Sequence, residues 1–191
     1  MTVSRYVTIP NVLSASRIIF LPLLYVFALG KMELAFVIAY ALIGITDLFD
    51  GYAARRLNQC SEFGKVLDSW ADLAYYASSA FFMARLHMDY LRPNMVFLWV
   101  FFGLLALSLL VSAIRCGKPI FMHSWVAKTA AAMVYVGVIV STFVDTTIFV
   151  AVILAVYSLA FIEAILIFLI HGDVDPDSPS IFRVRPNPTK S

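Results

Sequence analysis

The sequence is poor in cysteine and in net charge. Its two cysteines, Cys60 and Cys116, fit neither a metal-ligand spacing nor a disulfide framework, so we expect two reduced thiols. The 14 basic and 12 acidic residues leave a formal net charge of +2, which is too small to indicate a nucleic-acid-binding protein. The sequence has no internal repeat and no convincing signal-peptidase site, so we expect its first apolar run to remain as a membrane span.

Apolar residues are what the chain has in excess. They make up 62% of it, against about half in a typical soluble domain. The excess is gathered into about six blocks long enough to cross a bilayer. These blocks cover residues 11–30, 32–57, 62–87, 93–115, 122–144 and 146–171. The sequence therefore predicts an all-α integral membrane bundle of six transmembrane helices, which would form one domain over residues 1–171.

The two ends of the chain are expected to lie outside this bundle. Residues 1–10 hold Arg5, Tyr6 and Pro10 and predict a short interfacial segment before the first span. The tail, residues 172–191, combines aspartates and prolines with few apolar residues. We expect it to lie on the surface or to be disordered.

The basic residues predict the orientation of the spans. With six spans, nine basic residues lie on the side of both termini: Arg5, Arg55, Arg56, Lys65, Arg115, Lys118, Arg183, Arg185 and Lys190. The other side has three: Lys31, Arg85 and Arg92. Because basic loops stay in the cytoplasm, we expect both termini there, and in a prokaryote the membrane would be the inner membrane.

Four aspartates stand out against this apolar background. Asp47 and Asp50 lie three residues apart near the cytoplasmic end of the second span. Asp68 and Asp72 lie four residues apart at the start of the third. Each pair shares one face of its helix, and consecutive antiparallel spans can turn the two faces toward each other.

Such a cluster needs compensation, because one aspartate at mid-bilayer costs ~3 kcal/mol on an insertion scale. Ion pairs with Arg55, Arg56 and Lys65 are the structural alternative, but four clustered carboxylates also repel one another unless they are protonated or bind metal. An all-oxygen cluster suits one or two Mg²⁺ or Mn²⁺ ions better than zinc. The small residues among the aspartates are compatible with helix packing, yet beside carboxylates they favour a ligand pocket.

The acidic run resembles the signature of the CDP-alcohol phosphatidyltransferase family. It reads Asp47-x₂-Asp50-Gly51-x₂-Ala54-Arg55-x₈-Gly64-x₃-Asp68-x₃-Asp72 and matches every defined position. The opening Ile9-Pro10-Asn11-Val12-Leu13 ahead of Arg17-Ile18, the chain length and the six spans fit as well. The resemblance covers most of the chain but not the tail.

The resemblance implies a role for each residue of the motif. Asp47, Asp50 and Asp68 correspond to metal ligands, and Asp72 to the general base, which also touches a second metal. Gly51, Ala54, Arg55 and Gly64 correspond to positions that line the CDP site. A CDP-diacylglycerol-type lipid would be the donor, an acceptor hydroxyl would attack its lipid-side phosphorus, and CMP would leave. The resemblance also implies a homodimer.

The acceptor is less clearly indicated. Arg115, Lys118 and Lys128 could bind an anionic acceptor, although positive-inside anchoring also explains the first two. The run Trp125…Lys128-Thr129 resembles phosphatidylglycerophosphate synthases, which use glycerol 3-phosphate. Those enzymes often continue their motif with a Pro-Val-Ala-Asp-Lys-like stretch, whereas this chain has Ser69-Trp70-Ala71-Asp72-Leu73. Inositol phosphate, inositol, serine and phosphatidylglycerol therefore stay open as acceptors.

Two other functions fit less well. Intramembrane prenyltransferases need more helices and widely separated acidic motifs, whereas here both motifs lie within residues 47–72. A cation or proton transporter predicts carboxylates near the midplane and repeat-related halves, neither of which is seen in the sequence. Glu163, deep in the sixth span, has no role that the sequence indicates.

Overall fold

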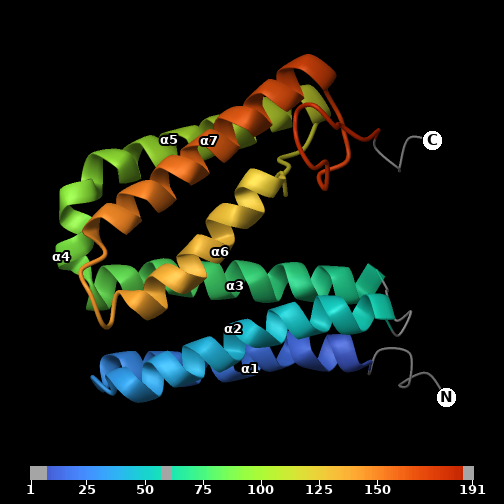
Figure 1. The fold of residues 1–191 in the computed structure, drawn as a ribbon. Coiled ribbons are helices and arrows are strands. Elements are labelled where there is room, and N and C mark those ends of the chain that lie inside the picture. Colours follow the sequence, from blue (N-terminus) through green and yellow to red (C-terminus); the bar gives the residue numbers. More distant parts are fainter. Residues whose placement is uncertain (1–7, 57–61, 187–191) are drawn as a thin grey trace. The chain divides into compact units, whose positions relative to one another are not determined.

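The computed structural model describes residues 8–56 and 62–186, with side chains described at these positions other than 47–56, 62, 65 and 69. Most of this part of the chain is helical (Figure 1). The long helices are α1 (Ile9–Leu29), α2 (Glu33–Arg56), α3 (Glu62–Leu86), α5 (Met95–Cys116), α6 (Trp125–Val140) and α7 (Thr147–His171). Each falls on one of the six predicted spans, so the all-α prediction is confirmed. Between α3 and α5 lie the short α4 (Met88–Leu91) and the 3₁₀ helix η2 (Arg92–Asn94).

Three helical segments are long and apolar enough to cross a membrane: Ile9–Leu29, Met88–Cys116 and Thr147–His171. Among the described residues there are also two shorter apolar helical stretches, Glu33–Thr46 of α2 and Trp125–Val140 of α6. The prediction of a span over 122–144 was too long. The last four residues of that range leave the helix in a turn, where the backbone N–H of Phe143 donates to the Val140 carbonyl at 2.9 Å. At 16 residues, α6 is about 24 Å long, shorter than a ~30 Å hydrocarbon core.

Residues 1–7 of the predicted interfacial segment lie outside the described residues. The helix α1 begins at Ile9. Thr8 caps this helix: its hydroxyl accepts a hydrogen bond from the backbone N–H of Asn11 at 3.4 Å. Pro10 occupies the first turn, where its missing N–H has no helical partner to lose. The Ile9-Pro10-Asn11 opening is thus a helix start.

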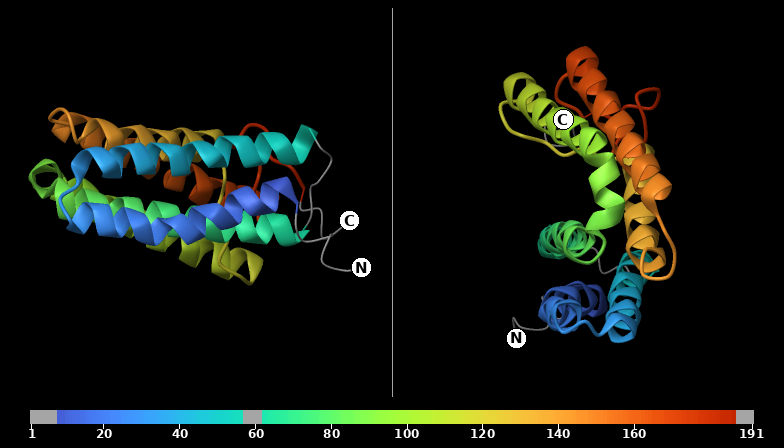
Figure 2. Two further views of the ribbon diagram at one scale, coloured as in Figure 1. Left: turned by 90° about the horizontal axis from the view of Figure 1, so that it is seen from below. Right: turned by 90° about the vertical axis from the view of Figure 1, so that its left-hand side faces the viewer.

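The chain forms two compact units. The first contains Met1–Met88 with Val138–Val144, and the second contains Asp89–Gly137 with Asp145–Ser191. In the first unit, α1 packs against both α2 and α3. Seen nearly along their axes in the right-hand view of Figure 2, these three helices stand at the corners of a triangle.

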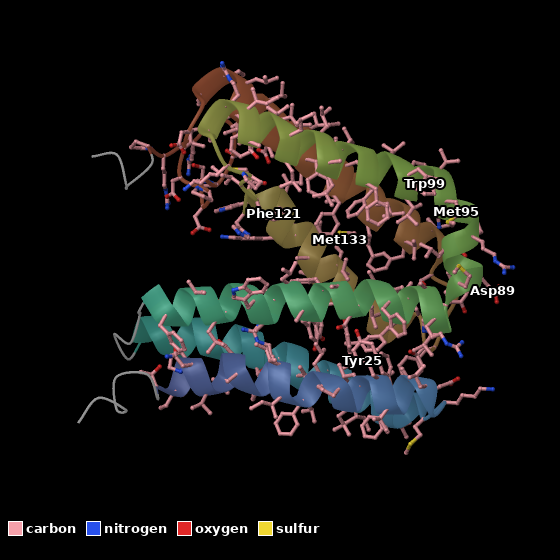
Figure 3. All side chains as sticks on the ribbon, turned by 180° about the vertical axis from the view of Figure 1, so that it is seen from behind. Tyr25, Asp89, Met95, Trp99, Phe121 and Met133 are labelled. Atoms are coloured by element: carbon pink, nitrogen blue, oxygen red, sulfur yellow. The ribbon has the colours of Figure 1, made fainter. Side chains whose placement is uncertain are left out.

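Polar contacts inside this triangle set the register of the helices. Tyr25 of α1, labelled in Figure 3, donates to the Ser78 hydroxyl of α3 at 2.9 Å. The Tyr40 hydroxyl of α2 lies 2.7 Å from the Ser79 hydroxyl, and Tyr75 donates to the Tyr40 carbonyl at 3.0 Å. Each of these pairs satisfies buried hydroxyl groups between helices, as membrane bundles require.

In the second unit, α5 and α7 run side by side and are tied at both ends. At one end the Asn94 amide donates to the Thr147 carbonyl at 2.8 Å. At the other end Arg115 donates to the carbonyls of Phe168 at 3.4 Å and Leu169 at 2.5 Å. The equal sequence offset of these contacts shows that the two helices are parallel.

Residues 172–186 of the tail fold back onto the second unit. The backbone N–H groups of His123 and Trp125 donate to tail carbonyls at Pro176 and Pro179, both at 2.9 Å. Glu163 of α7, to which the sequence assigned no role, accepts the Ile181 backbone N–H at 3.1 Å. Of the two possibilities that the sequence left open, this part of the tail fits the surface-lying one.

Candidate functional site

The first unit holds a buried arginine beneath two carboxylates. Arg17 of α1 is only 2% exposed, and its Nη2 and Nη1 pair with Oδ1 of Asp68 and Oδ1 of Asp72. The hydroxyl of Ser14, one turn earlier on α1, lies 3.4 Å from the same oxygen of Asp68 and 3.2 Å from the Pro10 carbonyl, so its one proton is shared between the two. The two carboxylates are partly open, with side chains 42% and 38% exposed. The buried Arg17 side chain therefore holds the partly exposed carboxylates of Asp68 and Asp72 close together.

The sequence spacing explains this arrangement. Ser14 and Arg17 are three residues apart on α1, and Asp68 and Asp72 are four apart on α3, so each pair lies on one helical face. The contacts between α1 and α3 keep a nearly constant sequence offset from Ser14 to Tyr25, which makes the two helices parallel. A charged arginine inside a membrane segment is tolerated when it faces the bundle interior and is paired.

The other two predicted metal ligands belong to the antiparallel helix α2. Their side chains, like those of Ala54 and Arg55 and the surroundings of Gly51, lie outside the described residues, although α2 continues to Arg56. Tyr40 is level with Tyr75 and Ser79. Because α2 and α3 are antiparallel and rise equally per residue, moving about seven residues forward from Tyr40 corresponds to moving about seven residues back from Tyr75 and Ser79. The backbone at positions 47–50 of α2 is therefore about level with Asp68 and Asp72 of α3. That the aspartates of α2 face those of α3 stays a prediction.

Gly64, the remaining predicted CDP-site residue, lies in the first turn of α3 and is half-buried. It precedes Asp68 by four residues, so the two positions share a helical face. A glycine allows close approach to the backbone beside it, and the assignment of Gly64 to a nucleotide site stays a prediction.

The described donors suit a hard divalent cation. Oδ1 of Asp68 and Oδ1 of Asp72 are near enough to each other to share one guanidinium, and oxygen ligands of this kind are preferred by Mg²⁺ and Mn²⁺. Within residues 8–46 and the described side chains beyond them, no group of three potential ligands occurs. Two of the four predicted ligands are not among these side chains, so the described part presents half of the predicted set.

Arg17 is a candidate site residue that the sequence did not indicate. It lies inside the first predicted span, residues 11–30. The signal that could have found it was its position, because an ionisable residue within a membrane segment is a functional candidate by default. Its partners could not be predicted, since they depend on the register between α1 and α3.

The three predicted acceptor-binding residues all lie in the second unit. Arg115 ties the C-terminal carbonyls of α7 to α5, as described above. Lys128, one turn into α6, lies 3.8 Å from Asp177 of the tail, with side chains 60% and 67% exposed. Lys118 is exposed, just after Gly117, whose left-handed φ of 76° ends α5. The structure therefore shows Arg115 hydrogen-bonded to the end of α7 and leaves Lys118 and Lys128 accessible.

A comparison with known protein families identifies the family of this chain. A family model described as CDP-alcohol phosphatidyltransferase matches residues 7–171. The chain belongs to this family. It is a multi-pass integral membrane protein, in keeping with its apolar helices. The match ends at His171, the last residue of α7, and leaves out the tail.

Curated relatives differ in their named acceptors. A CDP-diacylglycerol--glycerol-3-phosphate 3-phosphatidyltransferase of Aquifex aeolicus is 34% identical over 90 residues, covering 47% of this chain and 51% of the relative. A CDP-diacylglycerol--inositol 3-phosphatidyltransferase of Candida albicans is 34% identical over 85 residues, covering 44% and 36%. A cardiolipin synthase (CMP-forming) of Streptomyces coelicolor is 37% identical over 82 residues, covering 39% and 38%. The chain thus spans about half or less of the length of these relatives.

Proposed function

We propose that this protein transfers a phosphatidyl group from a CDP-linked lipid to a hydroxyl acceptor and releases CMP. Family membership supports the reaction class, and the names of the relatives share the same donor chemistry. The observation that carries the proposal is the joint presentation of Asp68 and Asp72 by Arg17 at one place on α3.

Asp47, Asp50, Asp68 and Asp72 would hold one or two Mg²⁺ or Mn²⁺ ions. A bound cation would supply charge neutralisation for the diphosphate oxygens of the donor and for the leaving CMP. The chain itself positions this carboxylate, since Arg17 of α1 donates to Asp68 of α3. Gly51, Ala54, Arg55 and Gly64 would line the CDP site, with Gly64 leaving room beside α3.

Asp72 is the proposed proton acceptor. The acceptor hydroxyl oxygen attacks the lipid-side phosphorus, and its proton passes to the Asp72 carboxylate. The bond from that phosphorus to the bridging oxygen breaks, and CMP leaves with the electron pair. An alcohol is a poor nucleophile near pH 7, so a positioned carboxylate contributes about 10²–10⁴-fold to such a step. The contact with Arg17 orients Asp72 for this role.

Glycerol 3-phosphate is the acceptor we favour. Its phosphate would meet the basic residues Arg115, Lys118 and Lys128, of which Lys118 and Lys128 are accessible in the second unit. Relatives named for glycerol 3-phosphate occur in bacteria such as Aquifex aeolicus and Salmonella choleraesuis. Inositol phosphate, inositol, serine and phosphatidylglycerol are the alternative acceptors for the same chemistry. We further propose a homodimer with both termini and the site on the cytoplasmic side.

The test is purified protein with CDP-diacylglycerol, Mn²⁺ and a panel of these acceptors, followed by CMP release and identification of the lipid product. CMP release with glycerol 3-phosphate is the expected result, and release with another acceptor would revise the acceptor alone. Protein that is folded but releases no CMP with any acceptor would contradict the proposal.

The acceptor site has its own test. We expect Lys128→Gln to raise the KM for glycerol 3-phosphate about tenfold, as loss of one charged phosphate contact predicts, with little change in kcat. Lys31→Gln, which removes an exposed lysine between α1 and α2, is the matched control and should leave both constants unchanged. Equal kinetics for the two variants would remove Lys128 from the acceptor site.

A further inference from the structure

The pairing of Arg17 differs from that of the other described ion pair. Lys128 and Asp177 are both more than half exposed, whereas Arg17 is 2% exposed and contacts two carboxylates. A guanidinium is a planar fork that can place separate N–H groups on two acceptors at once, and it keeps its charge when buried. One positive charge therefore lies permanently between two aspartates that belong to the proposed metal site.

We infer that Arg17 is a positioning residue that serves as an internal counter-cation: it holds Asp68 and Asp72 in place when no divalent cation is bound, and it competes with that cation for them. This inference rests on the proposed function. It goes beyond the metal ligands themselves, because it makes a residue of α1 set how tightly the carboxylates of α3 bind metal.

Charge balance explains the competition. Arg17 brings one positive charge to the carboxylates of Asp68 and Asp72, the same groups that a divalent cation would bind. A divalent cation bound by these carboxylates would lie near the guanidinium that contacts them, and the two positive charges would repel each other. Arg17 therefore weakens cation binding below what the bare carboxylates would show.

Charge balance also explains the positioning. Without a cation, removal of Arg17 would leave the carboxylates of Asp68 and Asp72 next to each other in a membrane segment without their shared guanidinium. With a cation bound, that loss is largely offset. The same substitution should thus destabilise the metal-free protein and strengthen metal binding. A residue that only packs α1 against α3 would lower the stability of both forms and would not tighten metal binding.

The experiment compares the wild type with Arg17→Gln, Arg17→Lys and a control, Arg85→Gln. Arg85 is an exposed arginine on the same α3, about 20 Å along the helix axis from Asp72. Thermal unfolding in detergent is followed with EDTA and with Mn²⁺, and the Kd for Mn²⁺ is measured by electron paramagnetic resonance in the absence of lipid.

For Arg17→Gln we expect a lower Tm in EDTA, a larger gain in Tm on adding Mn²⁺ than the wild type shows, and a Kd for Mn²⁺ about tenfold lower. Arg17→Lys keeps the charge without the forked guanidinium, so its Tm in EDTA and its Kd for Mn²⁺ should lie between those of the wild type and of Arg17→Gln. It also serves as the test variant if Arg17→Gln does not fold without metal. The control should match the wild type in its Mn²⁺ response.

Two results separate the inference from the proposed function. If the wild type binds Mn²⁺ and releases CMP but Arg17→Gln binds Mn²⁺ no more tightly, the inference is wrong and the proposed reaction stands. If the wild type releases CMP without binding any divalent cation, the metal assignment fails and the inference fails with it.

Discussion

The two units of the chain use the same kinds of charged side chain in different settings. In the first unit, buried Arg17 bridges two carboxylates that remain partly open. In the second, exposed Lys128 lies 3.8 Å from exposed Asp177. An exposed pair contributes about 0–1 kcal/mol, whereas a buried guanidinium such as that of Arg17 is costly to leave without its carboxylate partners. The first arrangement is therefore hard to change without consequence, and the second is not.

The two arginines of these units make the same contrast. Arg115 donates to the backbone carbonyls of Phe168 and Leu169 and so joins the ends of α5 and α7. Arg17 instead donates to side chains that the proposed reaction needs. A basic residue near a helix end of this protein can thus hold two helices together, as Arg115 does. Arg17 differs in being buried and in having carboxylate partners, which marks it as part of the proposed site. The predictions below test that distinction.

The largest effect is expected at the proposed base. Asp72→Asn should reduce transfer by about 10²–10⁴-fold, because the amide cannot accept the acceptor's proton. It should retain Mn²⁺-dependent nucleotide binding better than Asp47→Asn, which removes a proposed metal ligand. Rates come from CMP release and affinities from equilibrium binding of CDP. Equal loss of CDP binding in the two variants would overturn this division of roles.

A moderate effect is expected from the hydroxyl contacts between helices of the first unit. Ser79→Ala removes the 2.7 Å contact with Tyr40 and should lower the free energy of unfolding by about 1 kcal/mol. Ser158→Ala in α7 is the matched control, because Ser158 donates to the Leu154 carbonyl of its own helix at 2.8 Å. Thermal unfolding in detergent should show a clear shift for the first and almost none for the second. The same shift for both would mean that interhelical hydroxyls do not hold the triangle together.

A smaller and more local effect is expected at the tail. Glu163→Ala removes the acceptor of the Ile181 N–H, a contact of about 1 kcal/mol, so the tail should open about fivefold more often. Limited trypsin cleavage after the exposed Arg183 measures this opening. Glu163→Gln keeps a carbonyl oxygen and should behave as the wild type. Faster cleavage in the glutamine variant too would show that charge, rather than hydrogen bonding, secures the tail.

The smallest effect concerns the turn before α7. The Thr147 hydroxyl and backbone N–H both donate to Asp145, at 2.6 and 2.8 Å, and lower the pKa of its carboxyl below its usual value. A lowered folded-state pKa stabilises the fold above the unfolded pKa of about 4, and the contribution is lost as pH falls through the folded value. Asp145→Ala should therefore lower Tm slightly at pH 7, and the difference should vanish in acid. A difference that grows on acidification would reverse the assigned sign.

The sequence predicted the helices well, and physical reasons explain where it did not. Apolar blocks set the six helices because each must cover its backbone with nonpolar side chains in a bilayer. The block ending in Ser141-Thr142-Phe143-Val144 is apolar enough to continue a span, yet α7 begins at Thr147, so soon afterwards that these residues form the turn. Composition does not reveal such a competition between two helix ends.

The arrangement of the carboxylates on α3 could be predicted in part. The spacing of Asp68 and Asp72 places both on one face of α3, and the structure brings them to one guanidinium. The partner itself, Arg17, depends on the offset between α1 and α3, which arises from packing of the whole triangle. The contacts of Glu163 and Arg115 with backbone groups were equally beyond prediction, because a backbone N–H or carbonyl leaves no mark in a sequence pattern.

The central claim is that the carboxylates of the first unit carry the chemistry. The most direct measurement is CMP release from CDP-diacylglycerol with Mn²⁺ and glycerol 3-phosphate, comparing Asp72→Asn with Asp89→Asn. Asp89, labelled in Figure 3, is an exposed aspartate of α4 in the second unit. We predict that the wild type and Asp89→Asn release CMP at similar rates and that Asp72→Asn is at least about a hundredfold slower. Similar rates for the two variants, or a folded wild type that releases no CMP with any acceptor of the panel, would contradict the claim.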